Sequence, residues 1–557
     1  MPAQKRLEGI KVQKQIHNIY MTLLPRQIAS YVKSTSGQII DDIRATEERL
    51  IESLAALNSI TNHLFFRKYE PFGRTVPYAL VCLLVEPILL CLVQAYVSPV
   101  RWTRYLFTYG AFYASLLSSI ILYRLSPFHP LAKVPGPMMH KVSKLWSVWI
   151  CWQGRQHTEF KAMHDKYGPV VRTGPNEISV VDPSAVNDVL GAGGLPKGKW
   201  YLARQDERAP SNLLTLTGEK HANRRESGIE GSMQMLSKNT MRSSPKVLRC
   251  SLKDPSPLGI AGGGMTLMLI ISELPPTTFY LHSFDFMAEF VFGGGSDMLK
   301  EGKDKKEILE LLEHHMITGA LVAHIPWFFY LGNRIPRATE ATLKMRAYAV
   351  EWVQTRLAKG AKVKDLWYHL TDEAAREKEE HPLMKEVVAD ALLAIVAGAD
   401  TTSVALTNFF YMILKHPEHY QRVQEEVDRV YADGDATDVS KQSRLKYLSA
   451  CLNPECFYPR TDDFVPSRWL SANNSDSDSE DHKRHNRKAF LSFSSGPANC
   501  VGKKLARQEM LMVISLLMQR FKFTFAQDFD WEQWPETMKD FFATSRGPLR
   551  VVARTKS

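Results

Sequence analysis

A single cysteine near the end of the chain lies in a glycine-bracketed loop, Phe493-Ser-Ser-Gly496-Pro-Ala-Asn-Cys500-Val-Gly502. A helical pattern follows directly, so the sulfur lies near the positive end of a helix dipole, where backbone N–H groups favour the thiolate. A thiolate is a strong iron ligand, and glycines let the backbone approach a flat macrocycle. The loop therefore predicts a haem held by Cys500. A buried free cysteine in a tight turn is the alternative.

A second polar segment, Ala397-Gly398-Ala399-Asp400-Thr401-Thr402, interrupts a long apolar helical pattern. An acid and two hydroxyls are costly to bury unless they are hydrogen-bonded, and Gly398 weakens the helix. We therefore expect a local opening of the helix, in which threonine hydroxyls and water satisfy freed carbonyl groups beside a reactive centre. A polar helix face that contacts a neighbouring helix is the alternative.

Together these segments resemble the cytochrome P-450 superfamily of haem-thiolate monooxygenases. The superfamily's ligand loop reads Phe-x-x-Gly-x-[Arg/His]-x-Cys-x-Gly, and its long helix carries a closely similar Ala-Gly-x-Asp-Thr-Thr segment. The resemblance implies haem b with Cys500 as the axial iron ligand, whose sulfur donates electron density that favours O–O cleavage. It also assigns a group of residues to the cofactor site: His221, Arg225, Gly398, Phe493, Gly496 and Gly502.

Catalytic roles follow from the same resemblance. It implies that Thr401 holds and protonates the iron-bound oxygen and that Asp400 feeds protons inward, which is general acid catalysis through hydroxyls and water. His221 and Arg225 are four residues apart, so a helix places both on one face. In the family, a Trp or His four residues before an Arg binds a haem propionate, a bidentate task that suits Arg225. A merely solvated basic helix face is the alternative for this pair.

The pattern around these segments is mainly helical. Residues 166–181 read as two short strands around a Gly174-Pro175 turn, because β-branched residues alternate with polar ones. From residue 283 onward helical periods dominate, over residues 305–324, 337–358, 384–415, 417–431 and 501–521. We expect a mainly α fold with a minor β part, by resemblance the cytochrome P-450 fold, preceded by N-terminal membrane helices.

The chain departs from the family pattern in three places. Ala498 stands where the loop usually has Arg or His, so one propionate contact is missing. Asn453 is followed directly by Pro454, whereas family members place a Glu-x-x-Arg helix and several strands between the two segments; we interpret this as a deletion that leaves the fold incomplete. Resemblance also lapses over residues 226–282. The uncharged run at 256–272 is either a third membrane contact or, in our preferred interpretation, part of a translated non-coding or frame-shifted segment.

Length, charge and cysteine content narrow the class of protein. The 557 residues suffice for one large domain with a separate N-terminal region. A net charge of +11 and a pI near 9.1 suit an anionic membrane face or an acidic protein partner, and no nucleic-acid motif accompanies them. The seven cysteines are scattered and odd in number, which argues against a disulfide framework or a zinc set and indicates a reducing compartment.

Basic residues flank the ligand loop on both sides. Such a surface steers an acidic electron donor, mainly by raising the encounter rate. Solvated surface charge is an equally acceptable interpretation. The residues are Lys483, Arg484, Arg487, Lys488, Lys503, Lys504 and Arg507.

Two apolar runs lie ahead of the catalytic segments. Residues 76–97 are apolar apart from Glu86 and Gln94, and residues 105–123 carry no charge. Each approaches the roughly 20 residues that span a bilayer. The second is the safer span, because Glu86 lies near the middle of the first and a charge at bilayer depth costs about 2.5 to 3.5 kcal/mol. Flanking basic residues favour a hairpin with both ends in the cytosol. Buried core helices are the alternative.

These features divide the chain into four parts: an N-terminal extension of unassigned role (1–75), a membrane anchor of one or two helices (76–125), a proline-rich hinge (126–137) and a haem-thiolate catalytic domain (138–557). Prolines remove donors and fix φ, so we expect the hinge to be a stiff, extended linker that holds the catalytic domain close to the membrane.

The resemblance implies a monooxygenase that inserts one atom of O2 into a hydrophobic organic substrate, with electrons from NADPH through a flavoprotein reductase. By the same argument the enzyme is anchored by membrane lipid in the endoplasmic reticulum, with its catalytic domain in the cytosol. Two alternatives are a catalytically impaired isoform, because the Glu-x-x-Arg block is absent, and a haem-thiolate isomerase or dehydratase. The acid and alcohol pair of Asp400 and Thr401 argues against the latter.

Overall fold

The computed structural model describes residues 26–556 except 72–74, 98–101, 203–209, 227–275, 295, 302–303, 305–306, 329–335, 361–364, 372–383, 454–462, 471–485 and 487–488. The chain divides into two compact units, Met1–Ala132 and Lys133–Ser557. The first unit holds α2 (Arg26–Lys68), α3 (Val76–Val97) and α4 (Trp102–Leu125). Of the predicted anomalies, segment 226–282 and the abutment at Pro454 lie almost entirely outside the described residues.

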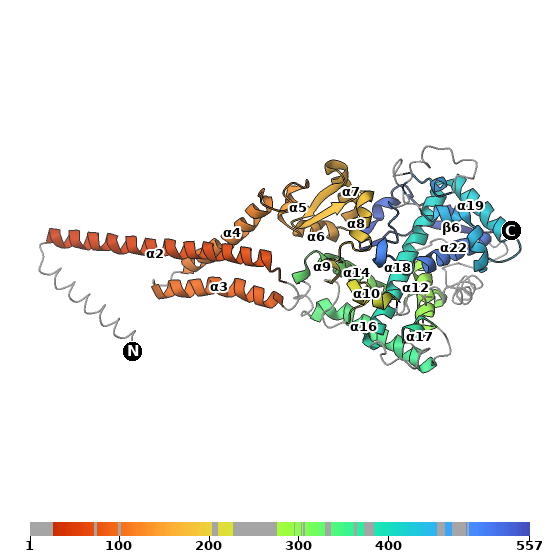
Figure 1. The fold of residues 1–557 in the computed structure, drawn as a ribbon, viewed down its shortest axis with the longest axis horizontal. Helices are drawn as coiled ribbons and strands as arrows, with labels where there is room; N and C mark the ends of the chain where they lie inside the picture. The colour runs from red at the N-terminus through yellow and green to blue at the C-terminus, as the bar shows by residue number, and fades with distance from the viewer. Residues whose placement is uncertain are drawn as a thin grey trace. The chain divides into compact units, whose positions relative to one another are not determined.

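The second unit is mainly helical with short strands (Figure 1). Its elements in chain order are α5 (Met138–Val142), α6 (Leu145–Trp152), α7 (Gln156–Tyr167), β1 (Val170–Gly174), β2 (Glu177–Val180), η2 (Pro183–Ala185), α8 (Val186–Leu190), α9 (Lys199–Leu202), α10 (Gly218–Arg224), α12 (Pro276–Phe292), α13 (Met298–Glu301), α14 (Ile308–Ala323), α16 (Pro336–Lys359), α17 (Leu366–Leu370), α18 (Met384–Lys415), α19 (Pro417–Val430), η5 (Val439–Arg444), α20 (Lys446–Cys451), η6 (Pro466–Trp469), η8 (Gly496–Ala498), α22 (Lys503–Arg520), β3 (Phe521–Phe525), η9 (Trp534–Thr537), β4 (Lys539–Phe541), β5 (Ala543–Ser545) and β6 (Val551–Thr555).

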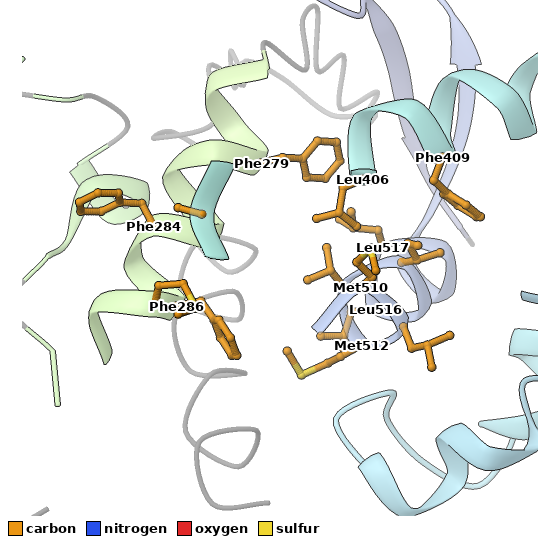
Figure 2. Close-up of a cluster of buried hydrophobic side chains, with 14 of the residues drawn as sticks. Phe279, Phe284, Phe286, Leu406, Phe409, Met510, Met512, Leu516 and Leu517 are labelled. Carbon is orange, nitrogen blue, oxygen red and sulfur yellow. The ribbon is translucent and has the colours of Figure 1, made fainter. Parts of the chain in front are cut away.

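The core of this unit lies between α12, α18 and α22. Apolar side chains at helical spacing on each helix face the other two, so packing removes them from water and stabilises all three helices. Figure 2 shows part of this cluster, with α12 on one side and α18 and α22 on the other. The labelled residues are Phe279, Phe284, Phe286, Leu406, Phe409, Met510, Met512, Leu516 and Leu517.

The strands form small antiparallel pairs. β1 pairs with β2 around the predicted Gly174-Pro175 turn, β3 pairs with β6, and β4 pairs with β5; each sheet has two strands among the described residues. The hairpin prediction is thus confirmed. So is the mainly α fold class with a minor β part.

The hinge differs in part from the extended linker that its prolines predict. His129 N–H donates to the Ser126 carbonyl and Ala132 N–H to the His129 carbonyl, so the chain makes successive turns after residue 126. Turns form there because these residues keep their N–H donors between the prolines. Only the end of the hinge is extended. There the Pro135 carbonyl accepts a 2.7 Å hydrogen bond from Arg172 N–H of β1.

Three described helices are long and apolar enough to cross a membrane, with candidate spans Val76–Val93, Tyr105–Leu125 and Met384–Lys415. The first two lie in α3 and α4, where the sequence predicts the membrane anchor. The third is α18, which packs in the core of the second unit. Length and composition therefore allow the first unit to be anchored in a membrane.

Candidate haem-thiolate site

The ligand loop is closed by its own backbone. Cys500 N–H donates to the Phe493 carbonyl at 2.9 Å, and Gly496 has φ +71°, a left-handed conformation that side chains with a Cβ disfavour. A Cβ added at Gly496 would lie 1.8 Å from the Leu190 carbonyl oxygen of α8. Gly496 thus brings the loop against α8. This close approach to protein backbone is a role for Gly496 that the sequence did not indicate.

The Cys500 thiol is exposed at the open side of this loop, two residues ahead of Gly502, which caps α22. Surrounding protein atoms raise the pKa of Cys500 by desolvation. The backbone N–H groups of Gly502 and Lys503, and the charges of Arg225 and Lys503, act in the opposite direction. The donors that a thiolate needs are therefore present, although burial outweighs them. A cation bound to the sulfur would shift the balance towards the thiolate.

Arg225 follows α10 and reaches the ligand loop. Its Nη1 donates to the Asn499 carbonyl at 2.7 Å and its Nη2 to Asn499 Oδ1 at 2.6 Å. Burial and the charges of Lys197 and Arg225 lower the pKa of His221, which is buried on the same helix. Burial, with a smaller contribution from Arg225, also lowers the pKa of Lys197. Arg225, His221 and Lys197 thus lie near one another, and Arg225 contacts the residue that precedes Cys500.

Helix α10 is held in place from α18. Arg224 Nη1 donates to Asp390 Oδ2 at 3.0 Å, and Arg224 Nη2 also pairs with Glu386. The second oxygen of Asp390 accepts from Leu213 N–H at 2.7 Å. The Arg224 and Asp390 side chains are largely buried, so their electrostatic interaction is screened less than it would be at the surface. These contacts set the position from which Arg225 reaches the loop.

Helix α18 remains continuous through the polar segment, which differs from the local opening that we predict from the sequence. Thr401 Oγ1 donates to the Ala397 carbonyl at 2.7 Å, so the hydroxyl bonds within the intact helix. Close packing explains why position 398 is a glycine, since a Cβ there would lie 2.5 Å from Sδ of Met287 in α12. Ala397 and Thr401 are exposed, and they form an open strip on an otherwise largely covered helix.

Asp400 faces a cavity of about 320 Å³ between α12, α14, α18 and the β4–β5 hairpin. Successive helical residues differ by about 100° in direction, so Asp400 and Thr401 lie on adjacent faces of α18. Burial and the negative charge of Glu313 raise the pKa of Asp400 to about 6. Burial and the charges of Asp400 and Glu313 raise the pKa of Tyr280, which also lines the cavity. A carboxyl with a pKa near neutrality can take up and release protons.

The residues present fit a haem with two propionates. Cys500 offers an accessible sulfur with backbone donors around it, and Arg225 and Lys197 supply positive charge nearby. The exposed strip of Ala397 and Thr401 leaves room beside a core helix. The fit to haem rests on this donor set.

Sequence reasoning missed several residues that shape this site. Lys197 and Glu313 lie in segments without a motif, and Tyr280 precedes the recognised part of α12. Arg224 and Asp390 could have been found from the sequence. Each lies within a dozen residues of a predicted site residue, and each is a charged residue in an otherwise amphipathic or apolar pattern. A search for charged neighbours of the motifs would have found these two.

Comparison with known proteins gives consistent findings. The family model described as Cytochrome P450 matches residues 139–454 and 451–550. Cytochrome P450 monooxygenase FCK2 of Fusarium pseudograminearum is 27% identical over 491 residues, covering 78% of this chain and 84% of that protein. Cytochrome P450 67 of Uromyces fabae is 26% identical over 576 residues, covering 90% and 99%. Tryprostatin B 6-hydroxylase of Aspergillus fumigatus is 25% identical over 485 residues, covering 80% and 84%.

Proposed function

Because the chain belongs to the cytochrome P450 family, we propose that it inserts one atom of O2 into a hydrophobic organic substrate, with Cys500 as the haem ligand. A haem held by a cysteine thiolate, O2, a redox partner and hydrophobic substrates are properties of the family. The chain is accordingly a P450-type oxidoreductase of the fungal type. The observation that carries the proposal is the loop in which Cys500 N–H bonds to Phe493 while its sulfur stays accessible.

We assign separate roles in binding the haem to residues of the ligand loop, of α10 and of α18. Bound haem supplies the activation of O2. Cys500 binds it from the ligand loop, and Arg225, Lys197 and His221 lie where they would bind the propionates and orient the ring. The Phe493, Gly496 and Gly502 backbone shapes the loop. Gly398 lets α12 and α18 approach each other closely, within one turn of Asp400 and Thr401.

Protons are handled by α18. We assign Thr401 as the hydroxyl that holds a proton at Oγ1 on the open face of the helix, and Asp400 as the carboxyl that supplies it. The pKa of about 6 supports this role, because the group is partly protonated near neutral pH. Asp400 and Thr401 lie on adjacent faces of the helix, so water or a side-chain rotation must complete the path.

Electron supply and location complete the proposal. An NADPH-dependent flavoprotein reductase would approach the ligand-loop side, where Lys503 and Lys504 are exposed. Arg507 is directed elsewhere: it is half-buried and donates to Asn453 Oδ1. The other predicted basic residues, at 483–484 and 487–488, lie outside the described part of the chain. We place the enzyme at the endoplasmic reticulum membrane with its catalytic unit in the cytosol.

The test is the absorption of the reduced, carbon monoxide-bound protein. The full chain, expressed with its N-terminal helices and purified in detergent, should show the red-shifted Soret band of a thiolate-ligated haem. Cys500→Ser should abolish that band, and Cys451→Ser is the matched control because Cys451 is buried in α20. A Soret band that is unchanged in Cys500→Ser would refute the assignment of the ligand.

An impaired isoform is the second candidate. The family model matches in two pieces that meet at residues 451–454, which supports a deletion between Asn453 and Pro454. Helix α20 ends at Cys451, and residues 454–462, which follow the abutment, lie outside the described part of the chain. If the purified chain takes up no haem while a version with the relatives' intervening segment restored does, the second candidate is correct.

A further inference from the structure

Over residues 50–66, helix α2 turns several polar side chains to the inside of the first unit and most of its large apolar side chains to the outside, while Ile51 and Ala55 are buried and Ser53 and Thr61 are exposed. Asn62 and His63 are buried, and Ser59 is 0% exposed, whereas Leu57 is 62% exposed. The other outward apolar residues are Leu50, Leu54, Ile60, Leu64 and Phe65. A helix in water shows the opposite arrangement. This polarity indicates that hydrocarbon, and not water, surrounds this part of α2.

The inward polar groups bind a carboxylate in the apolar helix α3. Asn58 Nδ2 donates to Glu86 Oε2 at 3.2 Å, and Asn62 Nδ2 donates to the same oxygen. Glu86 lies ten residues into the 22-residue helix, which would be near the bilayer midplane if α3 spans the membrane. Ionisable groups at that depth pair with polar side chains of neighbouring helices. The partners therefore have to lie at bilayer depth too.

Helix α4 contacts the same stretch of α2. His63 Nδ1 lies 2.7 Å from Ser119 Oγ, and Ala55 of α2 packs with Phe112 and Leu116 of α4. At the end of the stretch the guanidinium of Arg67 lies 3.9 Å from the centre of the Tyr123 ring. Basic and aromatic side chains are typical of the membrane–water boundary. The contacts thus follow α2 from mid-bilayer depth to one surface.

Helix α2 is not among the described helices that length and composition alone make candidate spans, so its case rests on these contacts. We propose that residues 50–66 of α2 form a third membrane-spanning segment, whose outer face binds lipid acyl chains and whose asparagines satisfy Glu86. Seventeen helical residues extend about 25 Å, near the lower end of what crosses a bilayer. Arg49 and Arg67 mark its two ends, and Glu52, half-buried and within one turn of Arg49, is the acidic residue that the segment itself contains. With three spans, the residues before α2 and the catalytic unit lie on opposite sides of the membrane, whereas a hairpin of α3 and α4 places them on the same side.

Glycosylation mapping tests this topology. An N-glycosylation acceptor tag is fused ahead of Met1 or after Ser557 in the full chain, and both proteins are synthesised with microsomes. We expect the tag to be modified at one end and not at the other, in membranes that retain the chain at alkaline pH. A single span by α4 would give the same pattern, so the variants below, which change α2 alone, separate these two topologies. Modification of both ends, of neither end, or loss of the chain from the membranes would each overturn the proposal.

A matched pair of variants tests the lipid contact of α2. Leu57→Lys places a charge on the outer face in the middle of the segment, and we expect at least a several-fold fall in the fraction with opposite-sided ends. Leu50→Lys is the control, since its ammonium lies beside Arg49 at the edge of the segment and can reach the polar region. Equal behaviour of Leu57→Lys and the unsubstituted chain would show that the outer face of α2 does not contact lipid.

Discussion

Replacing Gly496 by alanine should destabilise the ligand loop far more than the same change at Gly502. The new Cβ at Gly496 would lie 1.8 Å from the Leu190 carbonyl oxygen, whereas ordinary contact begins near 3.4 Å. Both partners are backbone, so neither can rotate away. A left-handed φ costs a residue with a Cβ about 1 to 2 kcal/mol, and overpacking adds about 1 to 3 kcal/mol. We therefore expect Gly496→Ala to lower the free energy of unfolding by about 2 to 5 kcal/mol.

Gly502→Ala is the matched control, because its Cβ would meet only Cys500 Sγ, at 3.9 Å, and its φ is −80°. We expect a loss of less than about 1 kcal/mol there. Urea unfolding of the full chain in detergent, followed by tryptophan fluorescence, measures both variants. Gly496→Ala should also lose most of the thiolate Soret band. Equal midpoints for the two variants would refute the argument that Gly496 is required by its contact with α8.

Three further changes test other contacts. Thr401→Ala should raise oxygen consumption per product formed by several-fold, and unchanged coupling would contradict its role in proton delivery. Asp365→Ala should cost about 3 to 5 kcal/mol of unfolding free energy, because it leaves the buried Arg356 guanidinium without the carboxylate that accepts at 3.0 Å. Asp400 has a folded-state pKa of about 6, above its value in the unfolded chain, so its contribution favours folding below about pH 4 and is lost as pH rises through 6. Compared with Asp400→Asn, the native chain should lose about 2 to 3 kcal/mol across that range, and parallel pH curves would disprove the raised pKa.

Periodicity and motifs were sufficient for much of this architecture. Residues 384–415 form α18 with the predicted bounds, because the apolar helical period continues on both sides of the polar segment and no proline lies within it. The hairpin at Gly174 was predictable for the same local reason. Contacts between distant segments were not predictable. Arg225 bonds to Asn499 across 274 positions in sequence, and Glu313 of α14 lines the same cavity as Asp400.

Two features could not be predicted from periodicity or composition. The sequence predicts an opened helix at Gly398, but the small residue serves close packing against Met287, and periodicity does not show which neighbour a glycine faces. Because of Glu86, the sequence also predicts that residues 76–97, which form α3, are the less favourable of the two membrane spans. The cost of that carboxylate depends on Asn58 and Asn62, in a helix whose mixed composition gave no sign of their role.

The bonds between Arg225 and Asn499 connect the ligand loop with α18 through α10. Arg224, the preceding residue, pairs with Asp390 of α18. Two consecutive arginines therefore join the helix that carries Asp400 and Thr401 to the residue before Cys500. A displacement of α10 would change the position of the loop and the contact with α18 together.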